Sequence, residues 1–184
     1  LIPRENWNTK WESDFNPIFV DERVSVRAPF HPETGADFDL VIQPKMSFGT
    51  GHHETTWLML RCMCDLDFAG KDVLDMGSGT GVLAILAEKL GAKSIAAIDI
   101  DDWAKENAEE NASLNDCVRI RALIGDAELL TSDCYDIILA NINRNVLVAD
   151  MPAYVKSMRD RGDIILSGFF CSDIPRLRAE TEKH

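Results

Sequence analysis

The sequence predicts an α/β protein built on a doubly wound, mostly parallel sheet. Short apolar strands alternate with helices from residue 71 onward, and these strands are apolar along both faces. That pattern is typical of a parallel sheet covered by helices on two sides. A glycine-rich segment follows the first of these strands and opens a helix. In such a fold the ligand lies at the carboxyl ends of the strands, near the point where the strand order reverses.

The first part of the chain, 1–45, is expected to be a linker that leads into the sheet domain at 46–184. Residues 1–16 are predicted to form a short helix, because aromatic residues recur there at every fourth position. These aromatic residues are Trp7, Trp11 and Phe15.

Two strands are predicted next, at 18–30 and 37–43, because apolar and polar residues alternate there. The alternating apolar residues are Val24 and Val26 in the first strand and Phe38, Leu40 and Ile42 in the second. The segment Pro-Glu-Thr-Gly at 32–35 is expected to supply the turn, so the two strands should form a β-hairpin.

The remaining elements follow in strict alternation. A buried strand at 73–74 leads through the glycine loop into a helix at about 82–90, and Gly91 stands where a helix C-cap is expected. The later predicted elements are strands at 95–100, 118–124, 135–140 and 164–166, and helices from 101 or 102 to about 114, from about 146 to 160, and over the last residues. Arg161 and Gly162 are expected to end the helix that precedes the last strand.

Composition and charge limit the classes of function. The formal net charge is −12, and no Lys/Arg cluster offsets it, so a phosphate backbone is repelled and direct nucleic-acid binding is disfavoured. A basic protein partner would be steered toward such a surface, although the charge also serves solubility alone. No run approaches about 18 apolar residues and no leader peptide is read, which disfavours a membrane protein. The five cysteines include no CxxC pair, and this usage fits the reducing cytoplasm.

The strongest local signal is the loop from Asp75 to Gly81, Asp-Met-Gly-Ser-Gly-Thr-Gly. Glycines such as Gly77 and Gly79 let the backbone turn sharply and approach a ligand. The dinucleotide fingerprint needs a third glycine where Val82 stands, and the phosphate loop needs a Gly-Lys-Ser/Thr ending that is absent. The Asp75 carboxylate would repel a pyrophosphate, but it favours the ammonium and sulfonium of S-adenosylmethionine. The loop therefore predicts a site for this phosphate-free methyl donor.

Two further acids follow the next two strands. Asp99, with Ile100 beside it, ends the second strand at a spacing from which an acid accepts hydrogen bonds from both ribose hydroxyls. The alternative role, a helix-capping acid, is already filled because Asp101 is available. Asp126 can accept from the adenine amino group while the backbone of Ala127 flanks the ring, although a Gly-Asp turn alone is common. The loop and the two acids form a specific set for S-adenosylmethionine.

After the fourth strand, Asn141 is the predicted catalytic residue. Positioning is the protein's main contribution to methyl transfer, and it is worth roughly 7–11 kcal/mol of the barrier. The Asn141 side-chain oxygen can accept an N–H bond and aim the lone pair of an amine; the alternative is a turn residue. Methyltransferases that act on adenine commonly carry Asn-Pro-Pro-aromatic here. No proline or aromatic residue follows Asn141, which favours a protein amine over a nucleobase.

A second segment, at 48–56, precedes the first sheet helix and reads Phe-Gly-Thr-Gly-His-His-Glu-Thr-Thr. Its glycines and threonines, Thr50 and Thr56 among them, suit a loop that closes over a ligand. A helix N-cap is the alternative for Thr50. The two histidines and the glutamate are consecutive, so they cannot share a helix face as metalloprotease ligands do, and no metal site is predicted.

Together these segments resemble the ribosomal protein L11 methyltransferase family in order and spacing, over nearly the whole chain. The specific part is the Phe-Gly-Thr-Gly-x-His-x-Thr-Thr segment at 48–56, whereas class I methyltransferases at large share the glycine loop. The other matching segments are 5–7, 11, 15–17, 22–23, 98–101 and 140–142. The resemblance implies a Rossmann-like class I fold, and trimethylation of the N-terminal amine and lysine side chains of a ribosomal protein of the large subunit.

The resemblance places the donor at Thr56, Gly77, Asp99 and Asn141, and it places Thr50 beside the acceptor amine. The full predicted donor-binding set is Thr56, Asp75, Gly77, Gly79, Gly81, Asp99, Ile100, Asp126, Ala127 and Asn141, with Asn141 and Thr50 as the catalytic residues. The resemblance also implies a small N-terminal recognition domain and two final strands beyond this sequence. Arg144 and Val146 stand where the family usually has Ala and Pro.

The sequence leaves other functions open beside the protein-amine methyltransferase. They are a methyltransferase of another protein lysine, of a small molecule or of a nucleobase, and a domain that binds the donor without turning it over. A NAD-dependent enzyme is the least supported, because the loop lacks the third glycine of the dinucleotide fingerprint.

Overall fold

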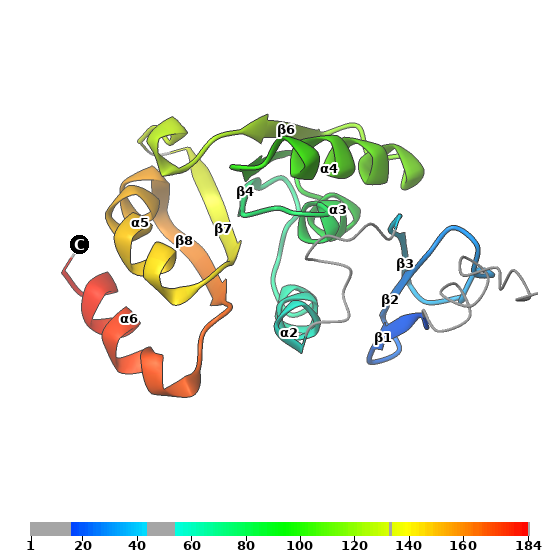
Figure 1. Cartoon of the computed structure of the whole chain (residues 1–184), viewed down its shortest axis with the longest axis horizontal. Helices are drawn as coiled ribbons and strands as arrows, with labels where there is room; N and C mark the ends of the chain where they lie inside the picture. The colour runs from blue at the N-terminus through cyan, green and yellow to red at the C-terminus, as the bar shows by residue number, and fades with distance from the viewer. Residues whose placement is uncertain (1–15, 44–53, 133, 184) are drawn as a thin grey trace, which may run out of the picture.

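The computed structural model describes residues 16–43, 54–132 and 134–183. A parallel sheet of five strands forms the centre, helices cover both of its faces, and a separate sheet of three short strands lies beside it (Figure 1). The predicted doubly wound α/β architecture is therefore confirmed. The predicted helix at 1–16 lies outside the described residues. Within the described part of the chain, no helix is both long enough and apolar enough to cross a bilayer.

The central sheet has the strand order β6-β5-β4-β7-β8, and every neighbouring pair is parallel. Its strands are β4 (Asp72–Met76), β5 (Ser94–Asp99), β6 (Ile120–Ile124), β7 (Tyr135–Asn141) and β8 (Met158–Ser167). The chain runs outward from β4 through β5 to β6 and then returns to the other side of β4 as β7. The strand order therefore reverses between β4 and β7, which is where such folds open a crevice at the carboxyl ends of their strands.

Alternate residues of the central strands enter two separate cores, which explains why the strands are apolar on both faces. Val73 and Ile137 pack with α2 (Glu54–Met63) and α3 (Val82–Lys89), whereas Leu74 and Ile138 pack with α5 (Arg144–Ser157) and α6 (Ile174–Thr181). The remaining helix, α4 (Asp102–Leu114), packs along β5 and β6.

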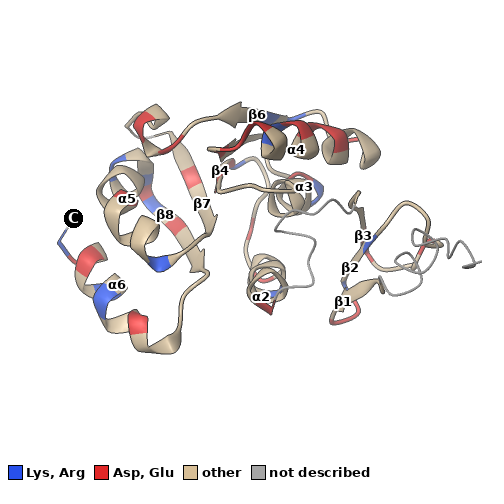
Figure 2. Cartoon of the chain, viewed as in Figure 1, with Lys and Arg blue, Asp and Glu red and all other residues tan. Residues whose placement is uncertain are grey.

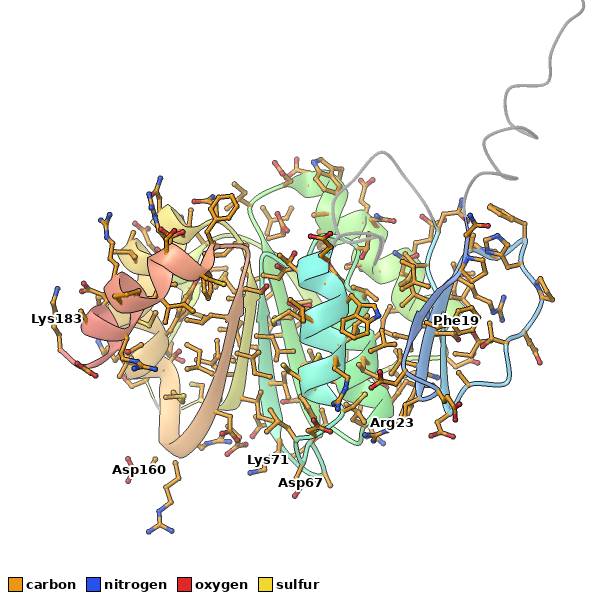
Figure 3. The ribbon with its side chains drawn as sticks, turned by 90° about the horizontal axis from the view of Figure 1, so that it is seen from below. Phe19, Arg23, Asp67, Lys71, Asp160 and Lys183 are labelled. Carbon is orange, nitrogen blue, oxygen red and sulfur yellow. The ribbon has the colours of Figure 1, made fainter. Side chains whose placement is uncertain are left out.

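The parallel strands start on one side of the molecule. Lys71, immediately before β4, and Asp160, early in β8, both lie at the lower edge of Figure 3. The carboxyl ends of the strands therefore face the opposite side, together with the loops that follow them.

The small sheet corrects the predicted hairpin. Its strands are β1 (Ile18–Val20), β2 (Val24–Arg27) and β3 (Phe38–Val41), and the antiparallel pair is β1 with β2. The strand predicted at 18–30 is interrupted at Asp21, which has a left-handed φ of 50°. β2 and β3 are parallel, so Pro-Glu-Thr-Gly at 32–35 belongs to a crossover and is not a hairpin turn. The parallel register places Arg27 beside Asp39, which form an ion pair of 2.8 Å between Nε and Oδ2.

The start of β8 corrects the predicted end of the preceding helix. α5 ends at Ser157 and the strand begins at Met158, although we expected helix to about 160 and strand from 164. Residues 158–160 are drawn into the sheet because Arg159 Nη1 bonds to Asp72 (2.9 Å) and Asp136 (2.7 Å). Arg161, with a left-handed φ of 64°, lies in an irregularity where the register with β7 shifts. The sequence signal at 161–162 therefore marks a bulge within a strand.

Candidate active site

A cavity of about 560 Å³ opens at the carboxyl ends of the central strands, at the reversal between β4 and β7. This volume lies in the range of small-molecule sites. Its lining includes the ends of β4, β5 and β7, the first turn of α2 and the inner side of α5. The described lining residues are Thr55, Thr56, Met76, Gly77, Ser78, Gly79, Val82, Leu83, Asp99, Ile100, Asp101, Trp103, Gly125, Asp126, Asn141, Ile142, Asn143, Val146, Asp150 and Gly168.

The glycine loop forms the floor of this cavity. Gly77 has a φ of 71°, and a Cβ there would lie 2.1 Å from Cγ2 of Ile142, so only glycine fits where the ends of β4 and β7 meet. Gly77 N–H donates to the Ile98 carbonyl over 2.8 Å, and Gly81 N–H closes a turn on the Ser78 carbonyl over 2.7 Å. The loop therefore presents its backbone to the cavity, and Ser78 is one of the lining residues.

Asp75 lies beneath the loop and does not line the cavity. It is almost fully buried, and its Oδ2 accepts from Ala84 N–H in α3 over 3.1 Å. Burial raises its pKa to about 7, the nearby charge of Asp99 adds to the rise, and the bond from Ala84 opposes it. Oδ1 has no hydrogen-bond partner among the described residues.

Asp99 and Asp126 both line the cavity, each just after or at the end of a strand. Asp99 Oδ2 accepts from Gly79 N–H over 2.9 Å, and Oδ1 accepts from Asp101 N–H over 3.1 Å. Asp126 Oδ1 accepts from Glu128 N–H over 2.9 Å at the start of η1 (Ala127–Leu129). A carboxylate has about four acceptor positions, so each acid keeps capacity for a ligand.

Asn141 ends β7 and is held by α2. Its Nδ2 donates to Thr56 Oγ1 over 3.1 Å, and Thr56 itself is buried. The Asn141 Oδ1 atom is buried and has no partner among the described residues. Because a buried acceptor without a partner costs free energy, this oxygen is suited to receive a donor from a bound molecule.

The charged groups of the cavity wall are carboxylates. Asp99, Asp101, Asp126 and Asp150 line it, and none of the described lining residues is Lys or Arg. Burial raises the pKa of Asp150, a bond from the Tyr154 hydroxyl lowers it, and the charge of Asp126 raises it. Such a wall attracts cationic ligands and repels phosphates.

The cavity brings together seven of the predicted residues. They are Thr56, Gly77, Gly79, Asp99, Ile100, Asp126 and Asn141. Three others lie just outside the lining: Asp75 beneath the loop, Gly81 at the start of α3 and Ala127 packed on the core of α5. Thr50 lies outside the described residues, as do His52 and His53.

Two lining residues, Asp150 and Trp103, were not predicted. Asp150 follows Val146 by one helical turn, so a carboxylate on the inward face of α5 was the available signal. Trp103 lies in the first turn of α4, directly after Asp101 and Asp102, which are the predicted helix caps. Within the described residues, no group of three or more His, Cys, Asp or Glu side chains is arranged to hold a metal ion.

Comparison with known sequences gives one consistent result. The family model described as ribosomal protein L11 methyltransferase (PrmA) matches residues 1–184. A ribosomal protein L11 methyltransferase of Porphyromonas gingivalis is 54% identical over 181 residues, which cover 96% of this chain and 62% of the relative. A protein of the same name from Phocaeicola vulgatus is 45% identical, over 97% of this chain and 64% of the relative. The chain thus spans a little under two thirds of the length of these relatives.

Comparison with solved structures agrees. The crystal structure of a ribosomal protein L11 methylase from Lactobacillus delbrueckii subsp. bulgaricus superimposes with a TM-score of 0.82 at 28% identity. The match covers 92% of this chain and 88% of that one. The match of the family model to the whole sequence, the identity to two relatives and the common fold lead to the same assignment. The chain belongs to the ribosomal protein L11 methyltransferase family.

Proposed function

We propose that this protein transfers methyl groups from S-adenosylmethionine to amines of a ribosomal protein, at lysine side chains and the N-terminal amine. The observation that carries the proposal is the unpartnered Oδ1 of Asn141 in a cavity walled by carboxylates. The names of the relatives support ribosomal protein L11 as the substrate.

The described residues fit the donor. S-adenosylmethionine, when bound, supplies an electrophilic methyl group on a sulfonium. Asp99 at the end of β5 suits the ribose hydroxyls, and Asp126 suits the adenine amino group, since both carboxylates line the cavity with acceptor capacity left. The Ser78 hydroxyl, buried and without a partner among the described residues, can serve the polar amino-acid end. Among the described lining residues none is Lys or Arg, which suits a cation that carries no phosphate.

Asn141 and Thr56 are proposed to orient the acceptor amine. The bond from Asn141 Nδ2 to Thr56 Oγ1 fixes the amide, so Oδ1 can accept an N–H bond and aim the nitrogen lone pair. A lysine must first lose a proton, which costs about 4 kcal/mol at pH 7, whereas an N-terminal amine costs about 1 kcal/mol. The carboxylates attract the cationic form into the cavity, and Asn141 then holds the neutral amine. Thr50 is proposed to lie beside this amine.

The surface charge supports a basic protein as the partner. Acidic side chains follow one another along the exposed side of α4, next to the cavity (Figure 2). The chain as a whole carries a formal net charge of −12. A basic ribosomal protein would be attracted over distances of about 10 Å at moderate salt, and nucleic acid would be repelled.

Calorimetry with S-adenosylmethionine and its demethylated product tests the donor, and labelled methyl transfer tests the acceptor. We expect both nucleosides to bind and label to enter purified ribosomal protein L11 on amines, as located by mass spectrometry. If the label enters RNA or a metabolite, the acceptor is not a protein amine, and that part of the proposal is wrong. Tight binding of NAD without binding of S-adenosylmethionine would overturn the proposed function.

A further inference from the structure

The buried side of α4 carries Asn107 and Asn111 at successive helical turns, and Asn115 follows one turn later as the C-cap. All three are almost fully buried, with at most 4% of the side chain exposed. A primary amide taken out of water needs hydrogen bonds to offset its lost solvation. Their partners therefore show what this side of the helix holds in place.

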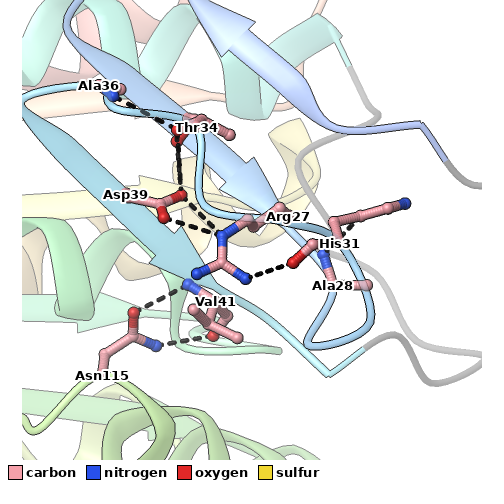
Figure 4. Close-up of polar contacts among 9 residues, drawn as sticks. Arg27, Ala28, His31, Thr34, Ala36, Asp39, Val41 and Asn115 are labelled. Carbon is pink, nitrogen blue, oxygen red and sulfur yellow. Dashed lines mark hydrogen bonds and ion pairs between the residues drawn. The ribbon is translucent and has the colours of Figure 1, made fainter.

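Asn115 attaches the small sheet to α4. Its Oδ1 accepts from Val41 N–H over 2.8 Å and its Nδ2 donates to the Val41 carbonyl over 2.7 Å, as Figure 4 shows. The amide thus pairs with both polar groups of one β3 residue, as a neighbouring strand would. Asn115 makes no described contact with the cavity lining.

Asn111 holds the same strand and, in addition, the glycine loop. Its Oδ1 accepts from Gln43 N–H over 2.8 Å, just beyond β3. Its Nδ2 donates to the carbonyl of Thr80 over 2.9 Å. Thr80 follows Gly79, whose N–H binds Asp99. One fully buried amide therefore connects the small sheet to the loop that forms the cavity floor.

We propose that Asn111 is a positioning residue for the donor: by holding the Thr80 carbonyl it fixes the turn from Ser78 to Gly81 in its donor-binding shape. This inference rests on the proposed function, because it takes the cavity to be the donor site. The Thr80 carbonyl belongs to the peptide that joins Thr80 to Gly81, so its direction sets the last peptide of this turn. Loss of the bond removes the side-chain donor that holds this carbonyl, and the turn can then change its direction.

The matched pair Asn111→Ala and Asn115→Ala tests the proposal. Both changes remove a buried amide from α4 and one attachment to the small sheet, so both should lower the thermal midpoint by similar amounts. Only Asn111→Ala removes the bond to the glycine loop. We expect its Kd for S-adenosylhomocysteine, measured by calorimetry, to rise roughly tenfold, which corresponds to one buried hydrogen bond. The Kd of Asn115→Ala should stay within about twofold of the unaltered chain.

Equal Kd values in the two variants, whether both unchanged or both raised, would overturn the inference. If Asn111→Ala does not fold, Asn111→Asp replaces it, because it keeps the acceptor for Gln43 N–H and loses the donor to Thr80. Weakened binding in that variant supports the inference, and unchanged binding overturns it. Failure of the unaltered chain to bind S-adenosylhomocysteine would overturn the proposed function itself, so the two failures are distinguishable.

Discussion

The two sheets of this protein differ in whether their buried polar side chains have hydrogen-bond partners. In the small sheet, Ser25 and Arg27 both donate hydrogen bonds to Asp39. At the carboxyl ends of the central sheet, Oδ1 of Asp75, Oγ of Ser78 and Oδ1 of Asn141 are buried without a partner among the described residues. An unpaired buried polar group costs about 1–3 kcal/mol. Ser78 and Asn141 line the cavity, so their two unpaired atoms mark the place where a ligand is expected to complete the structure.

The largest expected effect comes from breaking the ion pair between Arg27 and Asp39 in the small sheet. Arg27 is 9% exposed and bonds to both oxygens of Asp39 over 3.0 and 2.8 Å. Arg27→Ala leaves the largely buried Asp39 carboxylate without its cation, although the bonds from two hydroxyl groups remain. We expect a loss of about 3–5 kcal/mol in the free energy of unfolding, measured with urea. Donor affinity should change little in the protein that remains folded.

The control for this change is Arg23→Ala. The Arg23 side chain is 44% exposed, lies 3.8 Å from Asp65 and donates to the Cys64 carbonyl over 2.8 Å. Because the ion pair is screened by water, loss of the side chain should cost about 1–2 kcal/mol, mostly through the bond to the carbonyl. Equal losses for the two arginines would contradict the distinction between a buried network and a surface pair.

The second effect concerns Asn141 in the central sheet, whose buried Oδ1 has no partner among the described residues. Asn141→Ala should lower kcat for methyl transfer by about 10²–10³-fold, the usual effect of removing a preorganised polar group that acts on the reacting atoms. Donor affinity should fall by less than about tenfold, because Asp99 and the glycine loop remain. The measurement is single-turnover transfer of labelled methyl groups together with calorimetry. Asn145→Ala, at an exposed asparagine that bonds to Arg144, is the control. Full activity of Asn141→Ala would remove this residue from the mechanism.

The third effect separates the two sheets by the sign of their pH dependence. The folded-state pKa of Asp75 is about 7, above its unfolded value, so the folded protein binds more protons between about pH 4 and 7. Stability should therefore fall as pH rises through this window, by up to about 1.4 kcal/mol per pH unit. Asp75→Asn should flatten this slope in urea unfolding at pH 4.5, 6 and 7.5.

Asp39 in the small sheet should change the stability with pH in the opposite direction to Asp75. Although burial alone would raise it, bonds from Arg27, Ser25 and Thr34 hold the pKa of Asp39 below its ordinary value. Its contribution is present above about pH 4 and is lost as pH falls through the folded-state pKa. Asp39→Asn should therefore lower the free energy of unfolding at neutral pH and reduce the further loss on acidification.

An unchanged slope of unfolding free energy between pH 4.5 and 7.5 in Asp75→Asn would contradict the role given to Asp75.

The central sheet was predictable because its signals are local. Each strand is a short apolar run, and the glycine loop and the strand-end acids Asp99 and Asp126 follow directly in sequence. The small sheet was predicted with the wrong pairing, because the parallel register of β2 and β3 brings Arg27 within reach of Asp39, a contact between residues 12 positions apart that no local pattern marks. The start of β8 was missed for a similar reason, since Arg159 pairs with Asp72, 87 positions earlier. Contacts between distant charged residues left no periodic pattern to detect.

The residues of the candidate site also fall into those that the sequence predicts and those that it does not. Residues at strand ends were identified from topology alone, since parallel strands gather their carboxyl ends at one edge. Asp150 and Trp103 reach the cavity from helices, and their inward direction depends on how α5 and α4 pack. The role of Asp75 differs in detail from its prediction as the head of the loop, because its side chain turns inward to cap α3 at Ala84.

The smallest expected effect sharpens the comparison with a matched pair of serines. Ser25 and Ser78 are both buried, but Ser25 Oγ lies 2.6 Å from Thr34 Oγ1 and donates to Asp39 over 2.7 Å, whereas Ser78 Oγ has no described partner. Ser25→Ala should cost about 1–2 kcal/mol of unfolding free energy. Ser78→Ala should be neutral, or stabilising by up to about 1 kcal/mol, without donor, because it deletes an unpaired buried hydroxyl. With donor present, the stabilising effect of the ligand should be smaller in Ser78→Ala than in the unaltered chain, because the bound molecule loses a partner. Urea unfolding of both variants, with and without S-adenosylhomocysteine, measures these four values. If Ser78→Ala loses as much unfolding free energy as Ser25→Ala in the absence of ligand, the Ser78 hydroxyl stabilises the fold itself and is not kept for a ligand.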